Sequence, residues 1–130
     1  MLARLVLTCL VVLTLGAARA EAQTFTVSTS SDSGGGSLRA AVAAAGDGDS
    51  VVIPASVTAP IVLTSGQIAI NKSITITGAG SALTVLDGNH ASRVFDIASD
   101  GVSHPEVTIS DLTITHAFDV LPGLHVHRAI

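Results

Sequence analysis

The chain has 130 residues, of which 48% are hydrophobic, yet it contains only three Phe and no Trp or Tyr. Its formal net charge is −4, so its surface repels phosphate, and few rings are available to stack on bases. We therefore expect no nucleic-acid partner. The core must consist of small aliphatic side chains, which suits thin, regular layers, and one folded domain is expected at this length.

Residues 1–20 have the pattern of a signal peptide. Arg4 gives the segment a positive start, residues 5–15 are apolar, and residues 18–20 form a small-x-small cleavage site. The apolar run is shorter than the roughly 20 residues that span a bilayer. We therefore expect cleavage of this segment and a protein that is secreted or displayed at the cell surface. The single cysteine, Cys9, lies in the segment, so the mature chain would have no disulfide.

Residues 21–50 predict a lead strand and a short capping helix. Ser37 suits the N-cap because its hydroxyl can accept a hydrogen bond from the first turn. Gly46 is expected to end the helix in the left-handed conformation. A helix of about nine residues is too short to be stable alone in water, so its apolar side must lie on another element. That side is formed by Leu38, Ala41, Val42 and Ala45.

Residues 51–116 alternate short β-branched runs with turns rich in Gly, Pro and Asn. A β-sandwich would need strands of about six residues and hairpin turns, and these runs are shorter. A parallel β-helix needs short strands that stack coil on coil. We therefore predict an all-β fold, a parallel β-helix of two to three coils. The expected strands are residues 51–53, 61–63, 68–70, 74–76, 84–86, 94–97, 107–109 and 112–114.

An imperfect repeat supports this fold. Residues 73–78 and 111–116 are near-copies in which aliphatic residues alternate with Thr, and residues 107–110 are a shorter version. Since side chains alternate between the two faces of a strand, the aliphatic side chains are predicted to point into the coil and the threonines outward.

Four groups of short segments follow one another along the chain. They are residues 25–28 with 32–39, residues 49–54, residues 74–80, and residues 87–95 with 112–115. Their order resembles the N-terminal region of bacterial exported right-handed parallel β-helix proteins of the pectate-lyase-like superfamily, including those named for a C-S-L-R-E-A motif. The resemblance covers roughly residues 23–116, and it implies a right-handed winding and a longer shaft beyond the first coils.

Two departures from that family are visible. Ala40 stands where the family places Glu, so the reciprocal bond of a capping box is missing and a weaker helix start is expected. Residues 117–130 lack the Asn- and Gly-rich coil pattern with which the family continues. We expect these residues to form an irregular tail, produced either by truncation or frameshift or as a natural short form.

Candidate metal ligands occur at two places. Asp47 and Asp49 resemble the start of a calcium loop, but Val51 stands where a third ligand is needed, so we favour a polar turn between helix and strand. His125 and His127 would share one face of a strand and, with His116, supply imidazoles for zinc. Because no further ligand has a helpful spacing, we assign no metal or other cofactor.

Candidate catalytic groups are Arg93, Asp96 and Asp87, since polysaccharide lyases use aspartates and an arginine on a β-helix face. Arg93 and Asp96 are three residues apart, which places them on opposite faces of a regular strand. We therefore favour a structural contact between Arg93 and a nearby carboxylate. The N-T-D and G-H-G stretches of β-helix pectin hydrolases and the G-x-S-x-G elbow are absent, so we assign no catalytic residue.

Two pairs of threonines, Thr75 with Thr77 and Thr113 with Thr115, would form an outward ladder if their coils stacked. Such a ladder suggests sugar or ice as a ligand. Threonine is also the polar residue that best suits a strand, and we favour this simpler interpretation.

The sequence thus favours a non-catalytic structural segment, the N-terminal cap and first coils of a secreted, adhesin-like β-helix protein. A polysaccharide or a host or cell-surface ligand would bind to a longer shaft, and the open C-terminal end of the coils would permit self-association. The alternative is the N-terminal part of a carbohydrate-active β-helix enzyme, a lyase or hydrolase, with its catalytic coils beyond residue 130.

Overall fold

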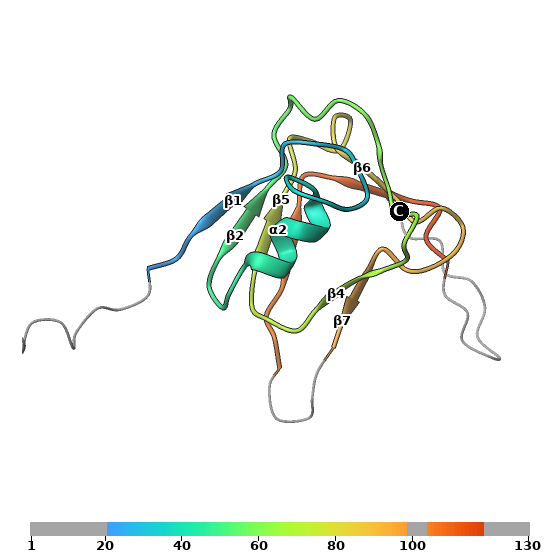
Figure 1. Ribbon diagram of the computed structural model, residues 1–130. Helices are drawn as coiled ribbons and strands as arrows, with labels where there is room; N and C mark the ends of the chain where they lie inside the picture. Colours follow the sequence, from blue (N-terminus) through green and yellow to red (C-terminus); the bar gives the residue numbers. More distant parts are fainter. Residues whose placement is uncertain (1–20, 99–103, 119–130) are drawn as a thin grey trace, which may run out of the picture.

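The computed structural model describes residues 21–98 and 104–118 (Figure 1). The predicted signal peptide and residues 119–130 of the predicted tail lie outside these residues. Nine short strands and one helix lie within them. The elements are β1 (Thr24–Thr26), α2 (Leu38–Ala44), β2 (Ser50–Val52), β3 (Ile61–Val62), β4 (Ile68–Ile70), β5 (Thr75–Thr77), β6 (Val85–Asp87), β7 (Phe95–Ile97), β8 (Thr108–Ser110) and β9 (Thr113–Thr115).

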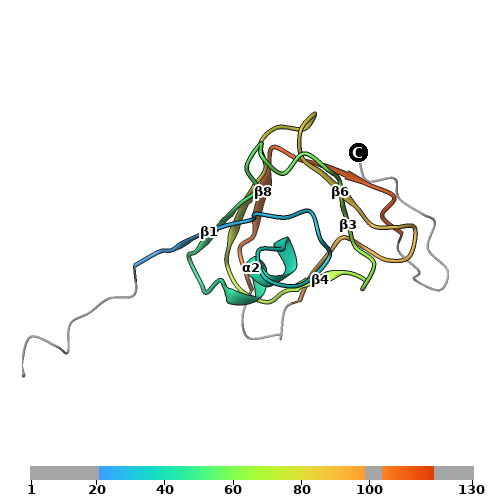
Figure 2. The same cartoon turned by 45° about the horizontal axis from the view of Figure 1, so that its top comes forward.

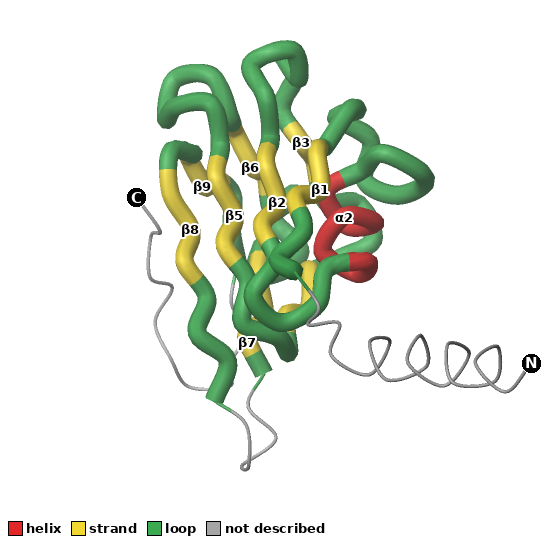
Figure 3. Tube along the Cα trace, turned by 90° about the vertical axis from the view of Figure 1, so that its left-hand side faces the viewer, coloured by secondary structure: helices red, strands yellow, loops and turns green. Residues whose placement is uncertain are grey.

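The strands form three parallel sheets, because each strand pairs with its counterpart in the next coil. The sheets have the orders β1-β2-β5-β8, β3-β6-β9 and β4-β7, and every pair is parallel. The three sheets surround one interior (Figure 2), and strands of successive coils lie side by side (Figure 3). The fold is therefore mostly β, a parallel β-solenoid of about three turns with one short helix. This confirms the predicted parallel β-helix; its right-handed winding stays a prediction.

The interior is a stack of aliphatic side chains. Val51 pairs with Ile76, and Ile76 with Ile109, so these three side chains lie above one another inside the first sheet. Val51 and Ile76 are fully buried, whereas Thr75 and Thr77 on either side of Ile76 are only partly buried. The predicted alternation of aliphatic and Thr residues is thus confirmed in this strand. Burial of each such aliphatic side chain contributes about 1.5–3 kcal/mol.

The two near-copies of the repeat lie in different sheets. The first copy contains β5, which pairs with β8, and the second contains β9, which pairs with β6. The segment stacked on residues 73–78 is therefore the shorter version, residues 107–110. Similar sequence here marks similar strand geometry, not neighbouring positions in one sheet.

Helix α2 begins as predicted and lies across one end of the solenoid. Ser37 is the N-cap, and its Oγ accepts a hydrogen bond from the backbone N of Ala40 at 3.2 Å. The backbone N of Ser37 donates to the carbonyl of Gly34 at 3.2 Å, so the group that a capping-box Glu would bind already has a partner. The helix contacts β2 and β4 and lies over the interior (Figure 2).

The end of the helix differs from the prediction. Gly46 is not among the residues with positive φ, so the left-handed stop predicted there is wrong. The C-cap, Ala45, is extended instead, with φ −66° and ψ 140°. Lys72 Nζ donates to the carbonyl of Ala43 at 3.3 Å and to that of Ala45, and the backbone N of Gly46 donates to Asp49 Oδ2 at 2.7 Å. Side chains from later in the chain therefore satisfy the groups that a glycine turn would have satisfied.

Candidate functional site

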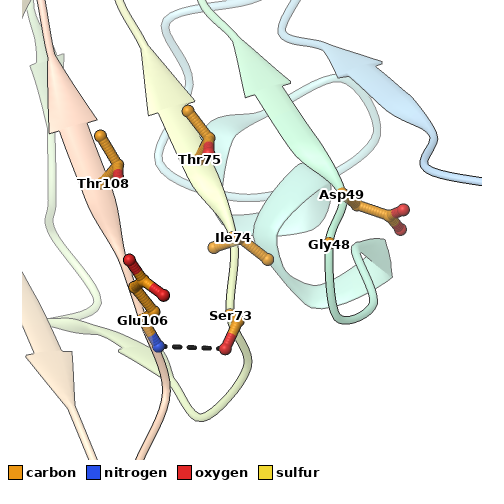
Figure 4. Close-up of a pocket in the computed structure, with 7 residues that line it drawn as sticks. All are labelled: Gly48, Asp49, Ser73, Ile74, Thr75, Glu106 and Thr108. Carbon is orange, nitrogen blue, oxygen red and sulfur yellow. Dashed lines mark hydrogen bonds between the residues drawn. The ribbon is translucent and has the colours of Figure 1, made fainter.

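A groove of about 220 Å³ lies where three successive strands of the first sheet begin (Figure 4). The turns before β2 and β5 and the start of β8 each supply one part of its wall. The groove is therefore a product of the stacking of three coils. Its lining residues are Gly48, Asp49, Ser73, Ile74, Thr75, Glu106 and Thr108.

Backbone hydrogen bonds between coils fix the walls of this groove. The backbone N of Gly48 donates to the carbonyl of Ser73 at 2.7 Å, and that of Thr75 donates to the carbonyl of Asp49 at 3.1 Å. On the other side, Ser73 Oγ accepts from the backbone N of Glu106 at 3.0 Å (Figure 4). The groove is thus held by main-chain contacts between coils and by one hydrogen bond from the main chain to the Ser73 hydroxyl.

The two carboxylates of the groove differ in their surroundings. Asp49 accepts hydrogen bonds from the backbone N of Gln23 at 2.8 Å and of Gly46 at 2.7 Å. These two bonds hold the pKa of Asp49 below its ordinary value of 3.8, so Asp49 is a fixed anion and is unsuited to donate a proton. Glu106 is exposed. The groove therefore offers one exposed carboxylate and one carboxylate fixed by two main-chain amides, beside hydroxyl groups, and no pair of carboxylates arranged for acid–base catalysis.

The segment with Asp47 and Asp49 forms a turn between α2 and β2. Asp47 Oδ1 accepts from the backbone N of Ser73 at 2.8 Å, so both aspartates bind main-chain amides. Within residues 21–98 and 104–118, no group of three or more His, Cys, Asp or Glu residues is placed to hold a metal ion. His125 and His127, named with His116 as zinc ligands, lie outside the described residues.

Arg93, Asp96 and Asp87 do not form one site. Arg93 Nη1 lies 3.3 Å from Asp96 Oδ1, so the prediction that they point to opposite faces is wrong. The reason is that Arg93 precedes β7, and strand alternation does not reach it. This contact is the structural pairing of Arg93 with a nearby carboxylate that the sequence favours over a catalytic role. Asp87 lies in another sheet and pairs with His116, whose Nδ1 is 3.0 Å from Asp87 Oδ2.

The two threonine pairs considered as a ladder do not stack on one another, because β5 and β9 lie in different sheets. Thr75 instead pairs with Ser50 on one side and Thr108 on the other. Hydroxyl side chains thus continue across the four strands of the first sheet, beginning at Thr24 in β1. The rungs come from residues that show no common motif in the sequence.

Sequence reasoning missed the role of Arg39, which ties the capping helix to the first coil. Its guanidinium group donates to Asp32 Oδ1 at 2.9 Å, to the carbonyl of Gln67 at 2.9 Å and to that of Gly66 at 2.6 Å. Ser65 Oγ donates to the other oxygen of Asp32. The opposite charges of Asp32 and Arg39 are a signal in the sequence for their ion pair. The backbone carbonyl groups of Gly66 and Gln67 give no such signal, because every residue has one.

The carboxyl of Asp32 is only 10% exposed, and burial by itself raises its pKa. The hydrogen bonds from Ser65 and Arg39, with the charge of Arg39, outweigh burial and bring the pKa below 3.8. Asp32 is therefore an anion at neutral pH, as its pairing with a guanidinium group requires.

These features define a parallel β-solenoid that a helix closes at one end. No helix within the described ranges is long and apolar enough to cross a membrane. No protein-family model matches the chain, and neither curated proteins nor solved structures yield a match.

Proposed function

We propose that this chain is the N-terminal cap and first coils of an exported, non-catalytic β-solenoid protein that acts at or outside the cell surface. The observation that supports the proposal most is that helix α2 closes one end of the solenoid. Leu38 and Val42 of α2 are 0% and 2% exposed where the helix lies over the first coil. An uncovered end would expose aliphatic side chains and strand edges, so repeat proteins need such a cap.

The opposite end contrasts with the closed one. Ile109 and Ile114, in β8 and β9, are only partly buried, whereas their neighbours Ile76 and Leu86 in the previous coil are fully buried. This difference in burial supports a solenoid that α2 covers at one end and on which a further coil stacks at the other end. A longer shaft of this kind would bind polysaccharide or a cell-surface ligand.

Export is part of the proposal and rests on the pattern of residues 1–20 and on the resemblance to exported right-handed β-helix proteins. Cleavage is expected after Ala20, so that the mature chain begins at Glu21. N-terminal sequencing of the protein recovered from the medium or cell surface of an exporting bacterial host tests this. Retention of the intact chain inside the host would count against export.

The capping role is tested by placing a charge under the helix. Leu38→Asp buries a carboxylate among aliphatic side chains, so we expect detachment of α2, loss of cooperative unfolding and oligomers in sedimentation velocity. Ala44→Asp is the matched control, because Ala44 belongs to the same helix and is exposed. Equal behaviour of the two variants would contradict the capping role.

The alternative, the start of a carbohydrate-active enzyme, is favoured by one observation, the exposed Glu106 in the groove. Because that alternative places its catalytic coils beyond residue 130, it is tested by incubating a full-length version of the protein, which carries those coils, with pectin and other acidic polysaccharides, with and without calcium. We expect no product. Sustained product formation that is lost in Glu106→Gln would overturn the non-catalytic proposal and place the reaction in the groove.

A further inference from the structure

The stacking of β6 and β9 brings two histidines together. Asp87, at the end of β6, pairs with Thr115, at the end of β9, so the turns that follow these strands lie on one another. The backbone N of Gly88 donates to the carbonyl of Thr115 at 2.9 Å, and that of His90 to the carbonyl of His116 at 3.0 Å. The imidazole rings of His90 and His116 have centroids 4.0 Å apart and planes tilted by 39°.

The backbone at both histidines is unusual. His90 has φ 56° and His116 has φ 49°, a left-handed conformation that is uncommon for residues other than glycine. Gly88 permits the close approach of the two turns, because a Cβ there would lie 2.8 Å from the carbonyl oxygen of His116. Backbone strain of this kind is concentrated at functional sites, and here it accompanies two rings held side by side.

A carboxylate orients one of the rings. Asp87 Oδ2 lies 3.0 Å from His116 Nδ1, and Asp87 Oδ1 accepts from the backbone N of Asn89 at 2.8 Å. The hydrogen bond to Asp87 engages Nδ1 of His116 and leaves Nε2, on the other side of the ring, available to a metal ion.

From this geometry we propose that His90 and His116 form a two-imidazole site for a divalent transition-metal ion such as Zn²⁺ or Cu²⁺, with Asp87 as the positioning residue. Imidazole nitrogen is a preferred ligand of these ions, and a ligating histidine commonly donates its other N–H to a carboxylate. Both rings are exposed, His116 by 46%, so the His90 ring can rotate toward the ring that Asp87 holds and place a nitrogen of each about 2.0–2.1 Å from one ion.

Water completes the coordination, because both oxygens of Asp87 are already bonded to His116 and Asn89. The two imidazoles come from successive coils, so a bound ion links the second coil to the third. Metal binding should therefore raise the melting temperature of the folded chain, since only the folded chain brings the two rings together.

The test is titration of the full chain with Zn²⁺ by calorimetry near pH 7.5, followed by thermal unfolding with and without the ion. We expect one equivalent to bind and the melting temperature to rise. His90→Ala and His116→Ala should each weaken binding at least tenfold and abolish the rise. Asp87→Asn should weaken binding by about 10–100-fold, the usual effect of losing such a partner.

The other histidines provide the controls. His104→Ala and the double variant His125→Ala with His127→Ala should bind Zn²⁺ as the parent chain does. The absence of stoichiometric binding, or binding lost only in these control variants, would overturn the proposal. If a variant at 90 or 116 fails to fold, substoichiometric Cu²⁺ is added to the parent chain, and the imidazole proton resonances are followed by NMR. Selective broadening at His90 and His116 supports the site, and broadening confined to other histidines refutes it.

Discussion

Arg39 and Asp32 show how single side chains fasten the cap to the solenoid. Arg39 belongs to α2, Asp32 precedes the helix, and the carbonyls of Gly66 and Gln67 belong to the turn between β3 and β4. The two side chains are 25% and 10% exposed. A partly buried pair with this many hydrogen bonds leaves costly unpaired groups when one partner is removed.

Asp32→Asn should therefore destabilise the chain by about 1–3 kcal/mol at pH 7, and the difference from the parent should shrink in acid. Because the pKa of Asp32 is lower in the folded than in the unfolded chain, the ionised carboxyl stabilises the fold above its ordinary pKa of about 3.8. That contribution is lost as the pH falls through the lowered value. Urea unfolding of parent and variant at pH 7 and near pH 3 measures the difference.

Asp111→Asn is the control for this pH dependence. Asp111 is exposed, and Asn tolerates its positive φ of 57°. We expect its stability to follow that of the parent chain at both pH values. A loss in Asp32→Asn that is the same at pH 3 and pH 7 would mean that the stabilisation does not come from the ionised carboxylate.

Gly78 lies where two coils approach each other closely. A Cβ on Gly78 would overlap the carbonyl oxygen of Asp111 and lie 3.0 Å from Leu112 Cβ. Gly78→Ala should therefore push the second and third coils apart and cost about 1–3 kcal/mol. At Gly35 a Cβ would meet nothing within 4 Å, so Gly35→Ala should leave the unfolding midpoint nearly unchanged. Equal midpoints for the two variants in chemical denaturation would contradict this account.

At the scale of elements, α2 depends on its surroundings. Seven residues cannot maintain a helix in water, so its stability comes from packing, from the Ser37 cap and from Lys72 at its other end. Ser37 is fully buried, and its Oγ also donates to the carbonyl of Gly34 at 2.7 Å. The cap therefore joins the helix to the glycine loop before it.

Ser37→Ala should lower the free energy of unfolding by about 1 kcal/mol, the usual cost of a lost N-cap. It should also speed amide hydrogen exchange at Ala40, whose N–H loses its acceptor. Ser33→Ala, at an exposed position in the same loop, should change neither quantity. Unchanged exchange at Ala40 in Ser37→Ala would show that the cap does not limit opening of the helix.

The sequence identifies local structure here better than it identifies partners. Short β-branched runs bounded by turn residues predict each of the strands β2 to β9, and Ser37 predicts the helix start, because both depend on neighbours along the chain. Register between coils does not follow from alternation, since many pairings bury the same face. For this reason the stacking of Thr75 on Thr108, the partners of Arg39 and the contact of Asp87 with His116 appeared only in three dimensions.

At the scale of the whole molecule, the solenoid has two unlike ends. About three turns is close to the minimum number of repeats that gives a stable stack, and Ile109 and Ile114 of the last described coil are only partly buried. We therefore expect the mature chain to self-associate or to unfold without full cooperativity. Sedimentation velocity over a range of concentrations, with thermal unfolding by circular dichroism, measures both. A monomer with one sharp transition would contradict the prediction.

The position of Lys72 has a consequence for the order in which the molecule is assembled. The lysine lies between β4 and β5, yet its ammonium group donates to carbonyls at the end of α2. Synthesis proceeds from the N-terminus, so α2 is synthesised before Lys72 has been added. Until then the last carbonyls of the helix lack this partner. Helix α2 is thus among the first parts of the chain to be made, and its attachment to the solenoid is completed only when the start of the second coil has been synthesised.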